Sequence, residues 1–146
     1  MKYFKTDGIR GIVNEDLTIE LIQKIGKTLN VLKIDKIYIG YDSRISSYLV
    51  LTSLVSGILA CGIEVINVGM VSTPLLQYVS NKYQVTTLMI TASHNPYYYN
   101  GIKIFKNGEK LTTYEEELIE DTIGKEILLK TGKYQISNKI TFDYIY

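Results

Sequence analysis

The sequence predicts an α/β fold, specifically a three-layer α/β/α sandwich with a mixed, mostly parallel sheet. Short apolar, β-branched runs alternate along the chain with longer segments in which apolar residues recur at helical spacing. Residues that cap helices stand at the start of several of these longer segments. With 146 residues and 46% hydrophobic content, the chain is long enough to bury one compact core.

The first helix is expected to begin after Thr18, which can cap it, and to run to about Lys33. Its apolar positions recur at a spacing that places them on one face: Ile19, Ile22, Ile25, Leu29 and Leu32. Residues 36–40 then form a short apolar run, which predicts the strand that follows.

The second and third helices are marked by their ends. Ser46 or Ser47 can start a helix that ends near Gly62, a glycine suited to a C-cap, and residues 63–68 are expected to form the next strand. The third helix begins at residues 73–74, where a proline suits the first turn.

In the rest of the chain, residues 87–91 predict a buried strand, and residues 101–105 predict a strand paired near it. Thr113 is expected to cap an acidic helix from residue 114 to about 123. Its carboxylates could be imagined as metal ligands, but acidic residues near a helix start favour the helix dipole, and we prefer that interpretation.

The last stretch, residues 125–146, has a weaker pattern. Residues 134–136 and 139–142 are expected to be short extended pieces, which would lose their partners if a following domain were missing. This tail is a candidate for disorder or for contacts in a homo-oligomer.

The most informative stretch for function is Thr91-Ala-Ser-His-Asn-Pro96, followed by Asn100-Gly-Ile-Lys103. Ser93 comes directly after the carboxyl end of a predicted strand, where ligands gather in open α/β sheets. Asn95-Pro96 favours a sharp turn, and Gly101 allows either a positive φ or close approach of the backbone to a ligand.

A bare serine hydroxyl is a weak nucleophile, so its neighbours decide its use. Consecutive side chains of an extended segment point to opposite sides, so Ser93 and His94 are not expected to form the pair of a hydrolase triad. A phosphoryl group on the serine fits better, because Lys103 and Arg10 could offset its charge. The alternative is a plain polar turn with a solvated lysine, and the residues alone leave the two about equal.

Four motifs together resemble the alpha-D-phosphohexomutase superfamily, which includes phosphoglucomutase, phosphomannomutase and phosphoglucosamine mutase. They occur in the family's order over nearly the whole chain: Phe4-Lys-Thr-Asp-Gly-Ile-Arg-Gly11, Gly40-Tyr-Asp-Ser-Arg-Ile-Ser46, Gly69-Met-Val-Ser-Thr-Pro-Leu75 and Thr91 to Pro96. Four motifs in the right order are far more specific than any one of them.

The resemblance implies a mutase in which a phosphoserine gives its phosphoryl group to a hexose phosphate and recovers another from the resulting hexose bisphosphate. It implies that Ser93 is that phosphoserine and that its phosphoryl group also binds Mg2+. Lys103 and Arg10 match the family's basic residues beside the phosphoserine, and His94 matches the histidine next to it. Asn95, Asn100 and Gly101 are expected to shape the loop or contact substrate.

Some positions depart from the family pattern. Lys5 replaces the usual glycine of the opening motif, where a positive φ would be strained for lysine. Residues 2–4, Asp7 and residues 101–103 look most like bacterial phosphoglucosamine mutases, whereas Tyr99 resembles the phosphomannomutase/phosphoglucomutase pattern. Glucosamine phosphate is therefore the favoured substrate.

The resemblance covers only the first of the family's four domains. We expect residues 1–138 to form this phosphoserine-bearing domain and residues 139–146 to begin the link to a second domain. No Asp-x-Asp-x-Asp metal loop occurs in the sequence, so the remaining Mg2+ ligands are expected from a missing domain. This chain alone is expected to be inactive, and the alternatives are a catalytically silent phosphate-binding or assembly module and one part of a split mutase.

Composition excludes several other classes. A net charge of +1 without a long basic run offers no field for nucleic acid. The apolar window 49–61 is interrupted by polar residues and is too short for a membrane span. With no signal peptide evident, a cytoplasmic protein is expected. The single cysteine, Cys61, is expected to be a small buried helix residue.

Overall fold

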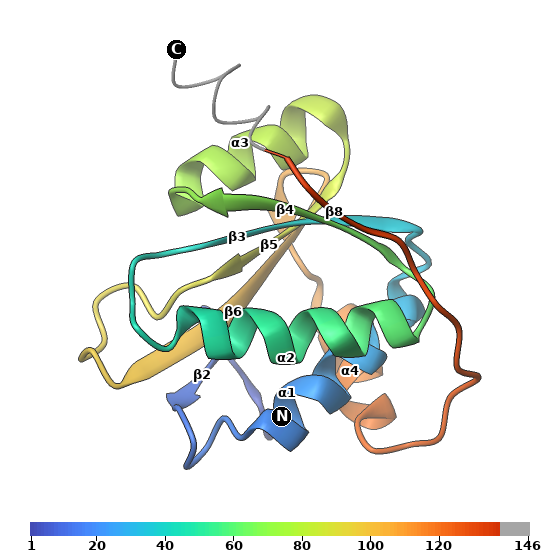
Figure 1. The fold of residues 1–146 in the computed structure, drawn as a ribbon, viewed down its shortest axis with the longest axis horizontal. Helices are drawn as coiled ribbons and strands as arrows, with labels where there is room; N and C mark the ends of the chain where they lie inside the picture. The colour runs from blue at the N-terminus through green and yellow to red at the C-terminus, as the bar shows by residue number, and fades with distance from the viewer. Residues whose placement is uncertain (138–146) are drawn as a thin grey trace.

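The computed structural model describes residues 1–137, which fold into helices packed on both faces of one sheet (Figure 1). The strands are β1 (Phe4–Lys5), β2 (Gly8–Ile12), β3 (Lys36–Tyr41), β4 (Glu64–Met70), β5 (Thr86–Ile90), β6 (Tyr99–Lys106), β7 (Glu109–Lys110) and β8 (Tyr134–Ile136). The helices are α1 (Ile19–Lys27), the 3-10 helix η1 (Leu29–Leu32), α2 (Ser47–Ala60), α3 (Thr73–Tyr83) and α4 (Thr113–Thr122). The predicted α/β class with flanking helices is confirmed.

The sheet is mixed, with the order β1-β2-β6-β5-β3-β4-β8, and β7 pairs with β6. Strands β5, β3, β4 and β8 run parallel to one another, whereas β6 turns back along β5 and is antiparallel to it and to β2. The parallel and antiparallel parts are therefore of similar size. The antiparallel part is larger than the sequence indicated, because the β1–β2 hairpin at the N-terminus was not expected.

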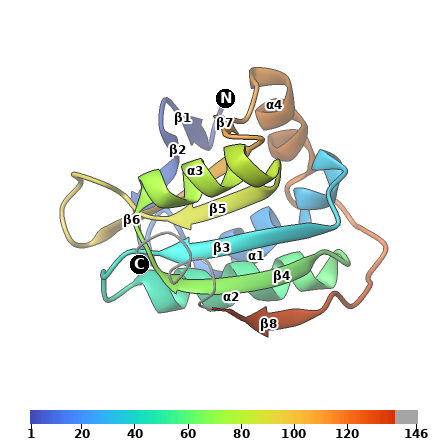
Figure 2. The ribbon, with the colours of Figure 1, turned by 90° about the horizontal axis from the view of Figure 1, so that it is seen from above.

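Two apolar clusters hold the layers together. On one face, α1 and α2 pack over the sheet with fully buried residues such as Ile22, Leu54 and Ile39. On the other face, α3 covers a smaller cluster that includes Leu76 and Met89. Figure 2 shows α3 on the near side of the sheet over β5, with α1 and α2 behind the sheet. Two covered faces explain why the central strand β5 is buried along its whole length.

Most of the predicted helix starts are confirmed, with one shift. The hydroxyl of Thr18 accepts a hydrogen bond from the Leu21 N–H and caps α1, and Pro74 lies in the first turn of α3. The cap of α4 is Thr112 and not Thr113. Thr112 and Glu115 form a reciprocal capping box, and Glu115 also pairs with Lys106 at 3.2 Å, which fixes the start of the helix one residue earlier.

The first helical segment is shorter than expected. Helix α1 ends at Lys27, where the Thr28 hydroxyl bonds the Ile25 carbonyl, and the chain continues as the tighter 3-10 helix η1. The apolar face is nevertheless largely confirmed, because its later members are buried in both pieces, while Ile19 in the first turn is 41% exposed.

The N-terminal hairpin resolves the question of Lys5. Lys5 lies in β1 and is not among the residues with positive φ, while Gly8 takes φ +86° and makes the turn into β2. The expected strain at Lys5 is therefore absent, because the backbone places its left-handed residue at a glycine.

The short strand predicted at residues 134–136 is confirmed as β8, which pairs in parallel with β4. Residues 139–142, predicted to be extended, and the proposed link 139–146 lie outside the described residues. Within residues 1–137, no helix combines the length and the apolar composition needed to cross a bilayer.

Glu120 ties the N-terminus to α4, and its substitution is expected to weaken that connection. Its carboxylate accepts hydrogen bonds from the N–H groups of Lys2, Tyr3 and Phe4 at 2.6–2.8 Å. Burial raises the pKa of Glu120, but these N–H donors and the terminal ammonium outweigh burial and hold the pKa below its usual value. We expect Glu120→Gln to lower the free energy of unfolding by about 1–3 kcal/mol at pH 7.

The pH dependence provides the control for Glu120. A carboxylate with a lowered pKa in the folded state contributes stability above the unfolded pKa near 4.5, and this contribution is lost as pH falls through the folded pKa. The difference in urea denaturation between wild type and Glu120→Gln should therefore shrink at acid pH. A difference that stays constant down to pH 2 would contradict this account.

Candidate functional site

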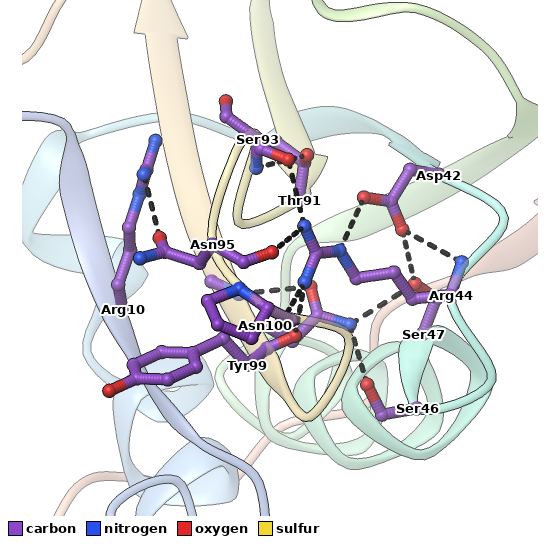
Figure 3. A network of polar contacts seen from close by, with 12 residues as sticks. Arg10, Asp42, Arg44, Ser46, Ser47, Thr91, Ser93, Asn95, Tyr99 and Asn100 are labelled. Atoms are coloured by element: carbon purple, nitrogen blue, oxygen red, sulfur yellow. Dashed lines mark hydrogen bonds and ion pairs between the residues drawn. The ribbon is translucent and has the colours of Figure 1, made fainter.

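The serine loop, residues 91–99, connects β5 to β6 at the carboxyl end of the parallel strands. Ser93 is exposed, and its φ of +49° lies in the left-handed region that serine rarely adopts. The Ser93 N–H donates to the Thr91 hydroxyl at 3.0 Å. Figure 3 shows the Ser93 side chain pointing away from the rest of the loop network. The hydroxyl is thus presented to the outside from a well-defined backbone.

His94 is also exposed, and within residues 1–137 no hydrogen bond joins it to Ser93. This geometry agrees with the expectation that the two residues do not form a hydrolase pair. Asn95 accepts a 2.9 Å hydrogen bond from Arg10 Nη1 through its side-chain oxygen, so it joins the loop to strand β2. Asn95 is therefore placed to shape the loop.

The two predicted cations lie on the same face of the sheet. Arg10 is the register partner of Gly101, and Lys103 follows two residues later on β6, so their side chains project to the same side. The Nε of Arg10 is buried and has no hydrogen-bond partner among the described residues. A cavity of about 230 Å3 adjoins Lys103, with charged and polar lining residues Asp7, Thr73, Gln77, Lys103, Lys110 and Glu116.

Gly101 is required by its neighbours and not by a positive φ. A Cβ at this position would lie 2.5 Å from the Ile9 carbonyl oxygen, 2.8 Å from the Thr91 carbonyl oxygen and 2.9 Å from Cγ of Arg10. The glycine therefore allows close approach between strands and beneath Arg10. Gly101 is not among the residues with positive φ, so that prediction is wrong, and the atoms it approaches belong to the protein. Its approach to a ligand stays a prediction.

Asn100 is fully buried, so it acts on the loop from inside and has no surface to offer a substrate. Its amide nitrogen donates to the hydroxyls of Ser46 and Ser47, at 3.0 and 3.1 Å, and its oxygen accepts from the Gly101 N–H. These bonds fix the end of the serine loop to the start of α2.

Arg44 is the residue that sequence reasoning missed. Its guanidinium donates to four carbonyl oxygens of the serine loop: Ser93 and Asn95 at 2.8 Å each, Pro96 at 2.6 Å and Tyr99 at 3.0 Å (Figure 3). Its motif, residues 40–46, is part of the family resemblance, but the sequence alone assigns no role to a residue within it. The signal available was an arginine shortly after a parallel strand, at the same edge as the serine loop.

Asp42 orients Arg44 from the other side. Its carboxylate lies 3.4 Å from Arg44 Nε, and it accepts hydrogen bonds from the Arg44 N–H at 3.1 Å and the Ser47 hydroxyl at 2.7 Å. Since the Arg44 side chain is only 13% exposed, its charge is balanced by this carboxylate and by carbonyl dipoles.

The described residues hold no metal centre of their own. Residues 1–137 contain no group of three or more His, Cys, Asp and Glu side chains that could bind a metal ion. Cys61 is buried at the end of α2, as predicted, and burial raises the pKa of its thiol. The acidic residues of α4 include two with structural tasks, since Glu115 completes the cap and Glu120 holds the N-terminus.

Fold and site together define an α/β domain with an exposed serine on a loop that Arg10 bonds through Asn95, and with Lys103 on the same face of the sheet as Arg10. An exposed hydroxyl and two cations at one end of the sheet suit the holding of a phosphoryl group. Residues 1–130 match the family model described as phosphoglucomutase/phosphomannomutase, alpha/beta/alpha domain I. The chain belongs to this family, and the described residues correspond to its first domain.

Relatives agree with this assignment. The chain is 46% identical over 132 residues to a phosphoglucosamine mutase of Dictyoglomus thermophilum, covering 86% of this chain and 29% of that protein. It is 41% identical over 152 residues to a phosphoglucosamine mutase of Clostridium botulinum, covering 97% of this chain and 34% of that protein. The chain thus spans about a third of the length of these curated relatives.

A solved structure supports the fold. A phosphoglucomutase/phosphomannomutase family protein from Burkholderia thailandensis superposes with a TM-score of 0.84 at 24% identity. The match covers 97% of this chain and 34% of that one. This likeness is evidence for the architecture of the domain and not for its substrate.

Proposed function

We propose that this chain is the phosphoserine-bearing domain of a phosphohexomutase, with Ser93 as the residue that carries the phosphoryl group. The observation that carries the proposal is the exposed Ser93 hydroxyl, held with a left-handed backbone on a loop that Arg10 bonds through Asn95, while Lys103 lies on the same face of the sheet as Arg10. A serine presented in this way needs no adjacent base to hold a phosphoryl group, because the cations offset its charge.

The proposed chemistry is a transfer in both directions. The phosphoryl group leaves Ser93 Oγ for a free hydroxyl of a hexose monophosphate, and the proton of that hydroxyl ends on Ser93 Oγ. The other phosphoryl group of the bisphosphate then returns to Ser93, so the sugar phosphate is isomerised with no net loss of phosphate. Arg10 and Lys103 stabilise the charge of the group in transit, and Lys103 and His94 are the candidates for moving the proton.

The described residues supply only part of a magnesium site. The exposed Ser93 can contribute one phosphoryl oxygen, and no acidic cluster in residues 1–137 completes an oxygen coordination sphere. Bound magnesium would supply charge neutralisation at the transferred group. Its remaining ligands are proposed to come from a further domain, which would also provide the partner surface for this one.

The names of the relatives favour glucosamine phosphate as the sugar, with other hexose phosphates as alternatives. We place the reaction in the cytoplasm, where phosphorylated sugars are made and used. Two different assemblies fit the chain: one complete mutase of several domains, and a mutase divided between separate chains. Among residues 1–137, β8 is the last strand of the sheet and its side chains are exposed, which is compatible with a homo-oligomer of either assembly.

The test is phosphopeptide mapping of the protein isolated from its native cells, before and after incubation with a hexose bisphosphate and Mg2+. We expect one phosphoryl group on Ser93, which the bisphosphate increases and the hexose monophosphate removes. Phosphorylation of another serine, or an unmodified Ser93 under all these conditions, would favour the alternative of a silent phosphate-binding module.

A further inference from the structure

Both arginines of the chain bond the serine loop, although the chain contains 16 basic residues in total and the others are lysines. Arg10 bonds the Asn95 side chain, and Arg44 bonds four backbone carbonyls of the loop. An ammonium group has no planar fork and cannot reach four separated carbonyls in this way. Position 44 therefore requires the planar, forked guanidinium group of arginine, because a positive charge alone would not make these bonds.

The carbonyl contacts of Arg44 also determine where the loop N–H groups point. In a trans peptide unit the C=O and the following N–H point in opposite directions, and the described chain has no cis peptide bond. Because the Ser93 and Pro96 carbonyls face Arg44, the N–H groups of His94 and Tyr97 face away from it. Neither N–H makes a hydrogen bond with another described residue.

The orientation of Ser93 fits the same picture. Its side chain points away from Arg44 in Figure 3, toward the side on which the His94 N–H is free. Outward-facing backbone N–H groups form anion-binding sites in loops. A phosphoryl group on Ser93 would therefore meet backbone donors as well as cationic side chains.

From these contacts we propose that Arg44 is a positioning residue. Arg44 does not touch the phosphoryl group. It turns the carbonyls of the serine loop inward, and the N–H groups of His94 and Tyr97 therefore point outward. The His94 N–H is then a backbone donor to a phosphoryl group on Ser93. Asp42 holds the Arg44 guanidinium in place, and the Ser47 hydroxyl in turn holds the Asp42 carboxylate. The inference rests on the proposed function for its biological meaning, but its geometry can be tested without any enzymatic activity.

The test uses the 146-residue chain with phosphoserine incorporated at position 93, compared with the unphosphorylated chain by amide NMR at one pH. In the wild-type sequence we expect phosphorylation to move the His94 amide proton downfield and to slow its exchange. In Arg44→Lys, which keeps the charge but loses the fork, both effects should fall by at least about half. Lys36→Gln, an exposed charge change at the start of β3, should leave them unchanged.

The outcomes are distinct. A full His94 response in a folded Arg44→Lys protein would overturn the proposal, and so would a wild-type His94 amide that does not respond to phosphorylation. If Arg44→Lys does not fold, Asp42→Asn replaces it, because this variant removes the carboxylate charge that lies against Arg44 Nε while keeping Arg44 and Ser47; a reduced His94 response then supports the proposal and an intact one overturns it. Failure of the proposed function would appear instead as an unmodified Ser93 in native protein, with the NMR result unaffected.

Discussion

Ser93→Ala is expected to abolish the proposed sugar phosphate isomerisation in the enzyme that, on our proposal, this chain forms with further mutase domains. Alanine has no oxygen to carry the phosphoryl group, so neither half of the proposed transfer can occur. When an active site loses its nucleophile, only background catalysis remains, so we expect kcat to fall by roughly 10⁴-fold or more. The measurement is interconversion of the two monophosphates of the proposed hexosamine substrate, with its bisphosphate present as activator.

The fold should survive this substitution. The Ser93 hydroxyl has no hydrogen bond within residues 1–137, and its N–H can still donate to Thr91. The matched control is Ser56→Ala, an exposed serine on α2 whose hydroxyl bonds Ser53 and Gln23 and, among residues 1–137, no residue of the serine loop. We expect this control to retain its activity. Substantial activity in Ser93→Ala would remove Ser93 from the proposed mechanism.

The site could be predicted in part because its key residues are close together in sequence. The loop 91–96 follows an apolar strand, and that local pattern is enough to place Ser93 at the carboxyl end of a sheet. Arg44 is different, because its bonds to the loop join residues 49 to 55 positions apart. Those contacts depend on β3 and β5 lying side by side, which hydrophobic periodicity does not specify.

The elements of the fold also differ in how far the local sequence predicts them. Strands and helices with strong periodicity, such as β5 and α2, form where the sequence indicates. The β1–β2 hairpin escaped prediction because each strand is short and its stability comes from pairing with β6 and from the bonds of Glu120 to residues 2–4. Tertiary partners thus decide the elements whose local signal is weak.

Gly101→Ala is expected to destabilise the domain and disturb the site together. The added Cβ would lie 2.5 and 2.8 Å from two backbone oxygens, Ile9 O and Thr91 O, which belong to the two segments flanking β6. Backbone cannot yield as a flexible side chain does, so the flanking segments must move apart. Overpacking of this kind costs about 1–3 kcal/mol, and here the upper part of that range is expected. The melting temperature should fall by roughly 5–10 °C.

The same clash also reaches the proposed phosphoryl site, because the third contact of the new Cβ is Cγ of Arg10 at 2.9 Å. Displacement of Arg10 would break its bond to Asn95, so Gly101→Ala should lower kcat in the completed enzyme even at temperatures where it stays folded. Gly124→Asn is the comparison variant, because a Cβ there meets nothing within 4 Å and its cost is confined to the backbone strain at a φ of +82°, which asparagine adopts more readily than most residues. A Gly101→Ala melting temperature equal to that of the wild type would show that the strands accommodate a methyl group at position 101, and the close packing beneath Arg10 would then not be what requires a glycine.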